Sequence, residues 1–176
     1  MTDRPIIFSA PMILALLDGR KTMTRRLAWR RDPAWGDAAP IVGKERDYML
    51  PTPWQRVAPG DRLWVRETWR LNAQGGLIEY RADWTGPAGK WRSPIHMPRH
   101  ASRLTLTVTG TKIEKLQMIR NADIKAEGIE GDPPKSVVFS ALWDMLHGLG
   151  AWAKNPEVVA LSFTVHPKNI ALVGEA

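Results

Sequence analysis

The sequence contains no cysteine and no long hydrophobic run, and each absence excludes classes of protein. With no cysteine among 176 residues, it cannot form a disulfide scaffold, a thiolate nucleophile, a zinc ribbon or an iron–sulfur site. The longest apolar run, residues 11–17, falls far short of the ~20 residues that a membrane helix needs. The first residues show no signal-peptide pattern. We therefore expect a cytoplasmic protein with no membrane partner.

The positive charge is distributed unevenly along the chain. The formal net charge is +7, yet residues 1–110 carry 18 basic and 10 acidic side chains, whereas residues 111–176 carry 7 and 8. Seven of the nine tryptophans also fall in the first part. Arginine and aromatic rings together suit phosphate contact and base stacking. The composition therefore favours contact with nucleic acid or a nucleotide about as strongly as a basic surface around a tryptophan-rich core.

Periodicity and turn signals predict one α+β domain over residues 1–176. Consecutive strands with short turns favour a small mixed or antiparallel barrel with flanking helices over a doubly wound sheet. Two stretches rich in proline and tryptophan, at about 29–58 and 83–100, lack periodicity and are expected to be irregular insertions. Strands are expected within 20–27 and at 62–70, 77–82, 103–110 (extending toward 116) and 158–165, and helices after Ser9, after Asn121 and at 133–146.

The densest chemical signal is the basic segment from Gly19 to Arg26, which follows the first predicted helix directly. Neighbouring arginines disfavour the ammonium form of Lys21, and burial would disfavour it further. A neutral lysine can activate a nearby hydroxyl, and Thr24 supplies one. Positions three apart in a strand face opposite ways, so the two side chains meet only if Lys21 lies in the turn. A solvated basic strand or a phosphate-binding patch is the simpler interpretation.

Two glutamates stand out beside this segment. Glu67 falls on the more apolar face of the strand predicted at 62–70, so it needs a partner, either Lys21 or an arginine. Otherwise it contacts a ligand or serves as an acid with a raised pKa. Glu127 precedes Gly128 at the end of a short predicted helix. The negative end of a helix dipole disfavours a carboxylate, which would suit Glu127 to act as an acid.

Other site signatures are missing from the sequence. The four histidines show no metal-ligand spacing with nearby carboxylates, so no metal site is expected. There is also no glycine-rich phosphate loop, no nucleophile elbow and no dinucleotide fingerprint.

Three segments resemble the ASCH domain family: the Gly-Arg-Lys-Thr-x-Thr-x-Arg run from Gly19, the Pro59-Gly60-Asp61 turn leading into Leu63-Trp64-Val65, and residues 124–129. Phage and prophage members share the segments resembling 91–103 and 139–148. The resemblance implies a PUA-like fold, a small β-barrel with flanking helices, associated with RNA and modified nucleobases. The small enzymes of the family are much shorter, and the surplus falls in the two insertions.

Within that family, bacterial N(4)-acetylcytidine amidohydrolases use a lysine, a threonine and a glutamate, which Lys21, Thr24 and Glu127 match. The resemblance implies that threonine attacks the acyl carbonyl, lysine takes its proton, and glutamate protonates the departing cytosine amine, with no cofactor and no metal. It leaves open a monomer or a homodimer. The residues expected to bind or stack a modified cytidine nucleoside are Arg26, Trp64, Glu67, Trp69, Tyr80 and Trp84.

Two other functions stay open at this stage. One is a module that binds single-stranded RNA or modified bases without turnover, and the other is an ASCH-type ribonuclease. The complete Lys21, Thr24 and Glu127 set favours the amidohydrolase, whereas the large basic insertions favour the alternatives.

Overall fold

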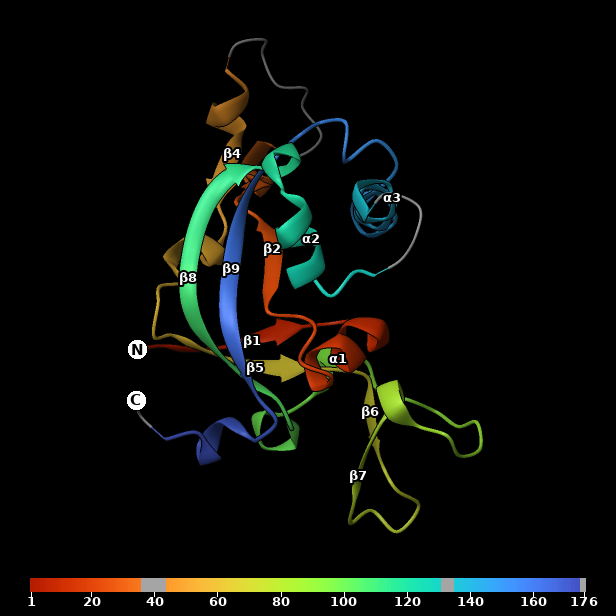
Figure 1. Cartoon of the computed structure of the whole chain (residues 1–176). Coiled ribbons are helices and arrows are strands. Elements are labelled where there is room, and N and C mark those ends of the chain that lie inside the picture. Colours follow the sequence, from red (N-terminus) through yellow and green to blue (C-terminus); the bar gives the residue numbers. More distant parts are fainter. Residues whose placement is uncertain (36–43, 131–134, 175–176) are drawn as a thin grey trace.

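The computed structural model describes residues 1–35, 44–130 and 135–174, and its centre is one five-stranded mixed sheet (Figure 1). In hydrogen-bonded order, the sheet contains β1 (Asp3–Ile7), β5 (Arg62–Arg66), β8 (Thr105–Lys115), β9 (Glu157–His166) and β2 (Met23–Leu27). Only the β1–β5 pair is parallel among these strands. In the described residues β1 and β2 form the two ends of this order, with no ladder joining them.

Strands β8 and β9 are the two longest strands of the sheet. They are long and visibly curved in Figure 1, and a register shift between Val108 and Gly110 interrupts their pairing. Bulges of this kind bend and twist strands locally. Apolar side chains alternate at the start of β8, because successive residues point to opposite faces, whereas the apolar residues 158–161 of β9 are all buried, so both faces of that strand are covered there. The inward set forms the main core with β1, β5 and α1: Ile6, Ile13, Leu16, Leu63, Val65, Leu104, Leu106, Val108, Val159, Leu161 and Phe163.

In the part of the chain that the structure describes, three α-helices accompany the sheet: α1 (Ala10–Leu17), α2 (Asn121–Ala126) and α3 (Lys135–His147). In Figure 1, α2 and α3 lie on the same side of the sheet, beside β2. Their apolar residues form a second core cluster with the start of β9: Leu116, Ile124, Ile129, Phe139, Trp143, Ala151 and Val158. In the described residues no helix has the length and apolarity that would let it cross a membrane.

The insertion at 29–58 contains a small sheet of β3 (Trp29–Arg31) and β4 (Met49–Pro51), although its residues 36–43 lie outside the described part. It is tied to the main sheet, since the side chains of Thr52 and Gln55 donate to backbone carbonyls of Leu27 and Ala28. The prediction of an irregular segment there is therefore wrong at β3 and β4. Short 3-10 helices occupy Pro33–Trp35, Glu45–Tyr48, Pro53–Arg56, Arg81–Asp83, Pro94–His96, Arg99–Ala101, Leu116–Met118 and Ile170–Leu172.

The strand predicted at 62–70 is two strands. β5 ends at Arg66, and the chain turns away to form β6 (Trp69–Leu71), which pairs with β7 (Ile78–Tyr80) in an arm that projects from the molecule (Figure 1). The α+β class, the mixed sheet and the flanking helices are confirmed. The break after Arg66 removes Glu67 from the regular strand alternation on which its predicted orientation depended.

Candidate active site

The turn after α1 places Lys21 inside the molecule. Gly19 has φ +71°, the left-handed conformation that commonly ends a helix. The Lys21 amide then donates to the Ala15 carbonyl at 2.9 Å, and Lys21 forms an isolated antiparallel bridge with Glu127. Strand β2 begins only at Met23. Lys21 therefore lies in the turn, which is the condition under which it can approach Thr24.

The end of α2 supplies the partner of Lys21. Glu127 caps α2, and its side chain is buried rather than exposed. The Lys21 ammonium donates to Glu127 Oε2 at 2.8 Å, to the Glu127 carbonyl at 3.0 Å and to the Met23 carbonyl at 2.9 Å. Lys21 is only 1% exposed. The pair joins residues that lie 106 positions apart in the chain.

Burial dominates the ionisation of Lys21. Desolvation lowers the pKa of Lys21 below 10.5, and the positive charges of Arg26 and Arg25 act in the same direction. The Glu127 carboxylate opposes this shift without cancelling it. The expectation that crowding by arginine and burial disfavour the ammonium is confirmed in direction.

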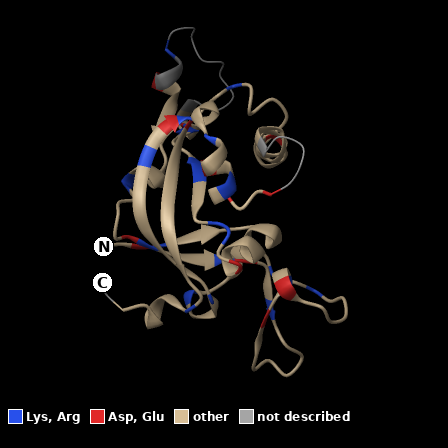
Figure 2. Ribbon diagram, viewed as in Figure 1, with Lys and Arg blue, Asp and Glu red and all other residues tan. Residues whose placement is uncertain are grey.

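Arg25 fixes the other side of Glu127. Its side chain is fully buried, and its guanidinium contacts Glu127 Oε1 at 3.3 Å, Glu114 at 2.8 Å and Asp123 at 2.8 Å. Lys112 contacts the last two carboxylates from the surface. Figure 2 shows the resulting mixture of basic and acidic segments where β8, β2 and α2 approach one another. Glu127 is thus held between two cations, one at each carboxylate oxygen.

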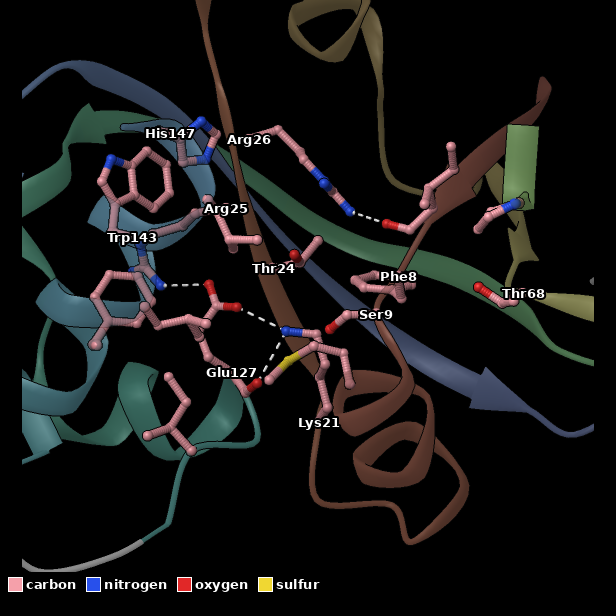
Figure 3. Close-up of a pocket in the computed structure, with 17 residues that line it drawn as sticks. Phe8, Ser9, Lys21, Thr24, Arg25, Arg26, Thr68, Glu127, Trp143 and His147 are labelled. Carbon is pink, nitrogen blue, oxygen red and sulfur yellow. Dashed lines mark hydrogen bonds and ion pairs between the residues drawn. The ribbon is translucent and has the colours of Figure 1, made fainter. Parts of the chain in front are cut away.

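Lys21, Thr24 and Glu127 line one cavity of about 370 Å³, together with Arg25 and Arg26 (Figure 3). That size lies in the range of small-molecule pockets. Thr24 is only 4% exposed and points into the cavity from β2. Within the described residues no side chain or carbonyl forms a hydrogen bond with its hydroxyl. The structure therefore brings the predicted threonine, lysine and glutamate together.

Aromatic side chains from two other elements complete the cavity. Phe8 follows β1, and Phe139 and Trp143 come from α3. His147 stacks on Trp143 with 4.2 Å between ring centroids. Burial lowers the pKa of His147, and the nearby charge of Arg26 lowers it further. A planar base would find apolar and aromatic walls here.

The aromatic residues predicted to stack a base do not line this cavity. Trp69 is buried beside Met97 and Ala101 in a separate cluster. The lining set also lacks Trp64, Tyr80 and Trp84. Their rings pack against arginines: Trp64 against Arg66, Tyr80 against Arg103, and Trp84 against Arg70.

Glu67 also lies away from the cavity, and its proposed pairing with Lys21 is wrong. Arg103 binds both carboxylate oxygens of Glu67 at 2.9 Å and also contacts Asp83. Burial raises the pKa of Glu67, although Arg103 opposes the shift. The alternative expectation, a structural pair with an arginine, is the one confirmed.

Several cavity residues were not identified from the sequence. Ser9 reads as a helix cap, yet its side chain makes no capping hydrogen bond and lines the cavity. Trp143 and His147 are four apart on α3, and that spacing places them on one helix face. Arg25 belongs to the basic motif, but nothing in the motif indicates three carboxylate partners. In the part of the chain that the structure describes, no cluster of His, Asp or Glu is arranged to hold a metal ion.

Comparisons with known proteins give one structural similarity. No protein-family model matches the chain, and no curated protein matches it. Among solved structures, it is similar to the crystal structure of an ASCH domain from Lactobacillus crispatus JV V101. The identity is 14% and the TM-score is 0.40, over 93% of this chain and 79% of that chain.

Proposed function

We propose that the protein is an amidohydrolase that removes the acyl group from N(4)-acylated cytidine or a related modified pyrimidine nucleoside. The observation that carries the proposal is the buried Thr24 hydroxyl, which faces the cavity beside the Lys21–Glu127 pair and has no hydrogen-bond partner among the described residues. A nucleophile, a base and an acid that line one cavity are what amide hydrolysis without a metal requires.

Lys21 and Glu127 share the proton that the reaction needs. Transfer of one proton along their 2.8 Å hydrogen bond leaves Lys21 as a neutral amine and Glu127 as a carboxylic acid. The lowered pKa of Lys21 favours this form of the amine. The pair then offers a base and an acid at the same time.

In the first half-reaction, Thr24 Oγ1 attacks the acyl carbonyl while its proton passes to Lys21 Nζ. The C–N bond breaks as Glu127 protonates the cytosine amine, which leaves an acyl ester on Thr24, an ammonium on Lys21 and a carboxylate on Glu127. Each positioned proton transfer contributes roughly 10²–10⁴-fold.

In the second half-reaction, the Glu127 carboxylate takes a proton from water, which attacks the ester. Thr24 Oγ1 leaves and recovers its proton from Lys21. The products are the free acid and the starting site, so atoms and charges balance over the cycle. Phe8 and Trp143 would flank the base in place of the rings expected from the sequence.

The test is release of cytidine from N(4)-acetylcytidine, followed by chromatography, for the intact protein and for Thr24→Ala. Thr22→Ala is the matched control, because Thr22 is exposed and two residues away. We expect turnover to fall by at least 10³-fold in Thr24→Ala and to persist in the control. Acylated Thr24, trapped by rapid quenching and found by mass spectrometry, would identify the nucleophile. Absence of turnover across a panel of N(4)-acyl cytidines would refute the proposed amidohydrolase activity.

A binding module for modified pyrimidines is the second candidate, and one observation favours it. The Lys21 Nζ donates to three oxygen atoms, and three acceptors stabilise the protonated ammonium, which has no lone pair to accept a proton from Thr24. If the acyl nucleosides bind without being hydrolysed, this function replaces the amidohydrolase.

A further inference from the structure

The charges around the cavity do not cancel locally. Four cations lie in or beside it, and three of them contact carboxylates: Lys21 contacts Glu127, Arg25 contacts three acids, and Lys112 contacts two of the same acids. Arg26 is the fourth. Within the described residues it forms no ion pair, so one positive charge is left without a contacting partner.

Arg26 is held at the cavity wall with unused hydrogen-bonding capacity. One terminal nitrogen donates to the Ile7 carbonyl at 2.7 Å, and the group lies 5.1 Å from the centroid of Phe8 and 5.6 Å from that of Trp54. Its Nε is buried and meets no acceptor among the described residues. Figure 3 shows the side chain reaching across the cavity toward the residues before α1.

Glu127 does not serve as the missing partner. Among the described residues that line the cavity it is the one carboxylate, and Lys21 and Arg25 occupy its two oxygens. Its charge reaches Arg26 only at longer range, and burial lowers the pKa of Arg26 despite it. A partly buried guanidinium without a contacting acid is costly, which suits a site completed by a bound anion.

The start of α1 adds a second positive contribution. Ser9 and Met12 bring the first turn of this eight-residue helix to the cavity. That turn contains no acidic residue, and the Ser9 side chain does not cap it. Free backbone N–H groups and the positive end of the helix dipole attract anions. Arg26 and α1 therefore present positive character to the same space.

We infer that Arg26 binds an anionic oxygen group carried by the substrate. Two sources share this chemistry: a phosphate on the ribose of the nucleotide, or a carboxylate on the acyl chain. The inference rests on the proposed function for the identity of the base, but binding of the anion requires no turnover. It makes Arg26 the residue that discriminates charged from uncharged substrates.

The test is a binding measurement by calorimetry in low salt, with each anionic ligand paired with its neutral counterpart. One arm compares CMP with cytidine. The other compares N(4)-succinylcytidine with N(4)-acetylcytidine on Thr24→Ala, so that neither is consumed. Charge-assisted hydrogen bonds predict a preference of roughly tenfold to 100-fold for the anionic member in one arm, and that arm identifies the source of the anion.

Arg26→Gln should remove the preference, and Arg26→Lys should keep part of it, because lysine retains the charge but not the planar fork. Arg30→Gln is the matched control, since Arg30 is exposed on β3, and it should bind like the intact protein. Melting curves show whether Arg26→Gln is folded, and Arg26→Lys supplies the answer if it is not. Equal binding of charged and uncharged ligands in both arms, or an unchanged preference in Arg26→Gln, would overturn the inference. If the intact protein binds the anionic ligand but hydrolyses no acyl nucleoside, the proposed amidohydrolase activity is contradicted and the inference about Arg26 is not.

Discussion

At the scale of single residues, Lys21 sets the pH dependence of the proposed reaction. Attack by Thr24 needs neutral Lys21, and burial lowers the pKa of Lys21 below 10.5. Because Glu127 must hold the pair's one proton while Lys21 is neutral, we expect kcat/KM to fall as pH rises through the lowered pKa of Lys21, where that proton is lost to solvent. The free energy of unfolding should also increase from the lowered pKa up to 10.5, because over that interval the unfolded chain binds the proton more tightly.

The measurement is kcat/KM from pH 5 to about pH 10, with Lys125→Met as a control that leaves the profile unchanged, because Lys125 is exposed. A rate still rising at the upper limit would show that the reaction does not need the proton shared by Lys21 and Glu127.

A second prediction at this scale concerns the contribution of Arg25 to stability. Its replacement by methionine leaves Glu127, Glu114 and Asp123 without their shared cation. Loss of one partner from a buried ion pair costs roughly 3–5 kcal/mol, and Lys112 keeps the cost toward the lower value. Urea denaturation measures it. Arg30→Met, on the surface, should change stability by no more than about 0.5 kcal/mol.

Glu67 gives a third prediction, because it lies outside the cavity. Burial raises the pKa of Glu67, so between 4.5 and the raised pKa the folded state binds more protons than the unfolded chain. The free energy of unfolding contributed by Glu67 therefore falls as pH rises through that interval. Glu67→Gln should remove this contribution and leave turnover intact. Glu130→Gln, at an exposed position, should leave the slope of the free energy of unfolding against pH unchanged. A large loss of turnover in Glu67→Gln would show that Glu67 takes part in the reaction.

At the scale of elements, the close approach of α1 and α2 positions the acid–base pair. Gly128 has φ +82°, and a Cβ there would lie 2.8 Å from Ala15 Cβ and 3.0 Å from Lys21 Cβ. Gly128→Ala adds overpacking of about 1–3 kcal/mol to the backbone cost of about 1–2 kcal/mol. Gly148 has φ +97° with open space around it, so Gly148→Ala isolates the backbone cost.

Urea denaturation and turnover measured on both variants test this contact. We expect Gly128→Ala to be the less stable of the two and to lose activity, because the strain falls on the turn that holds Lys21. Equal destabilisation by the two substitutions would show that the contact with Ala15 relaxes without cost.

The helices and strands also show which features could be predicted from the sequence and which could not. Alternation at the start of β8 and the start and stop signals of α1 are local, so they could be predicted, and so could the Lys21 and Thr24 motif. The burial of Glu127 depends on a contact across 106 positions, which no local pattern encodes. The prediction of which aromatic residues line the cavity failed for a related reason. Trp143 belongs to the apolar stripe of α3, where packing and base binding produce the same signal.

At the scale of the whole molecule, the net charge of +7 bears on how a substrate arrives. Long-range attraction of an anion is screened by salt, with a Debye length of about 10 Å at 0.1 M. If the substrate is anionic, kcat/KM should fall as salt rises from 0.05 to about 0.5 M, and kcat should change little. The uncharged N(4)-acetylcytidine is the control and should show a nearly flat response. A parallel decline for both would indicate a general effect of salt on the fold.

The bridge between the turn after α1 and the end of α2 has a consequence that needs no substrate to detect. The Thr22 amide donates to the Ala126 carbonyl at 2.8 Å, and the Thr22 carbonyl accepts from the Phe163 amide at 3.0 Å. The Thr22 amide can exchange with deuterium only when the α2 end separates from this turn, which also parts Lys21 from Glu127. Its exchange rate therefore measures how often the acid and the base come apart. An occupant of the cavity that touches both elements should slow that exchange, whether or not it is ever hydrolysed.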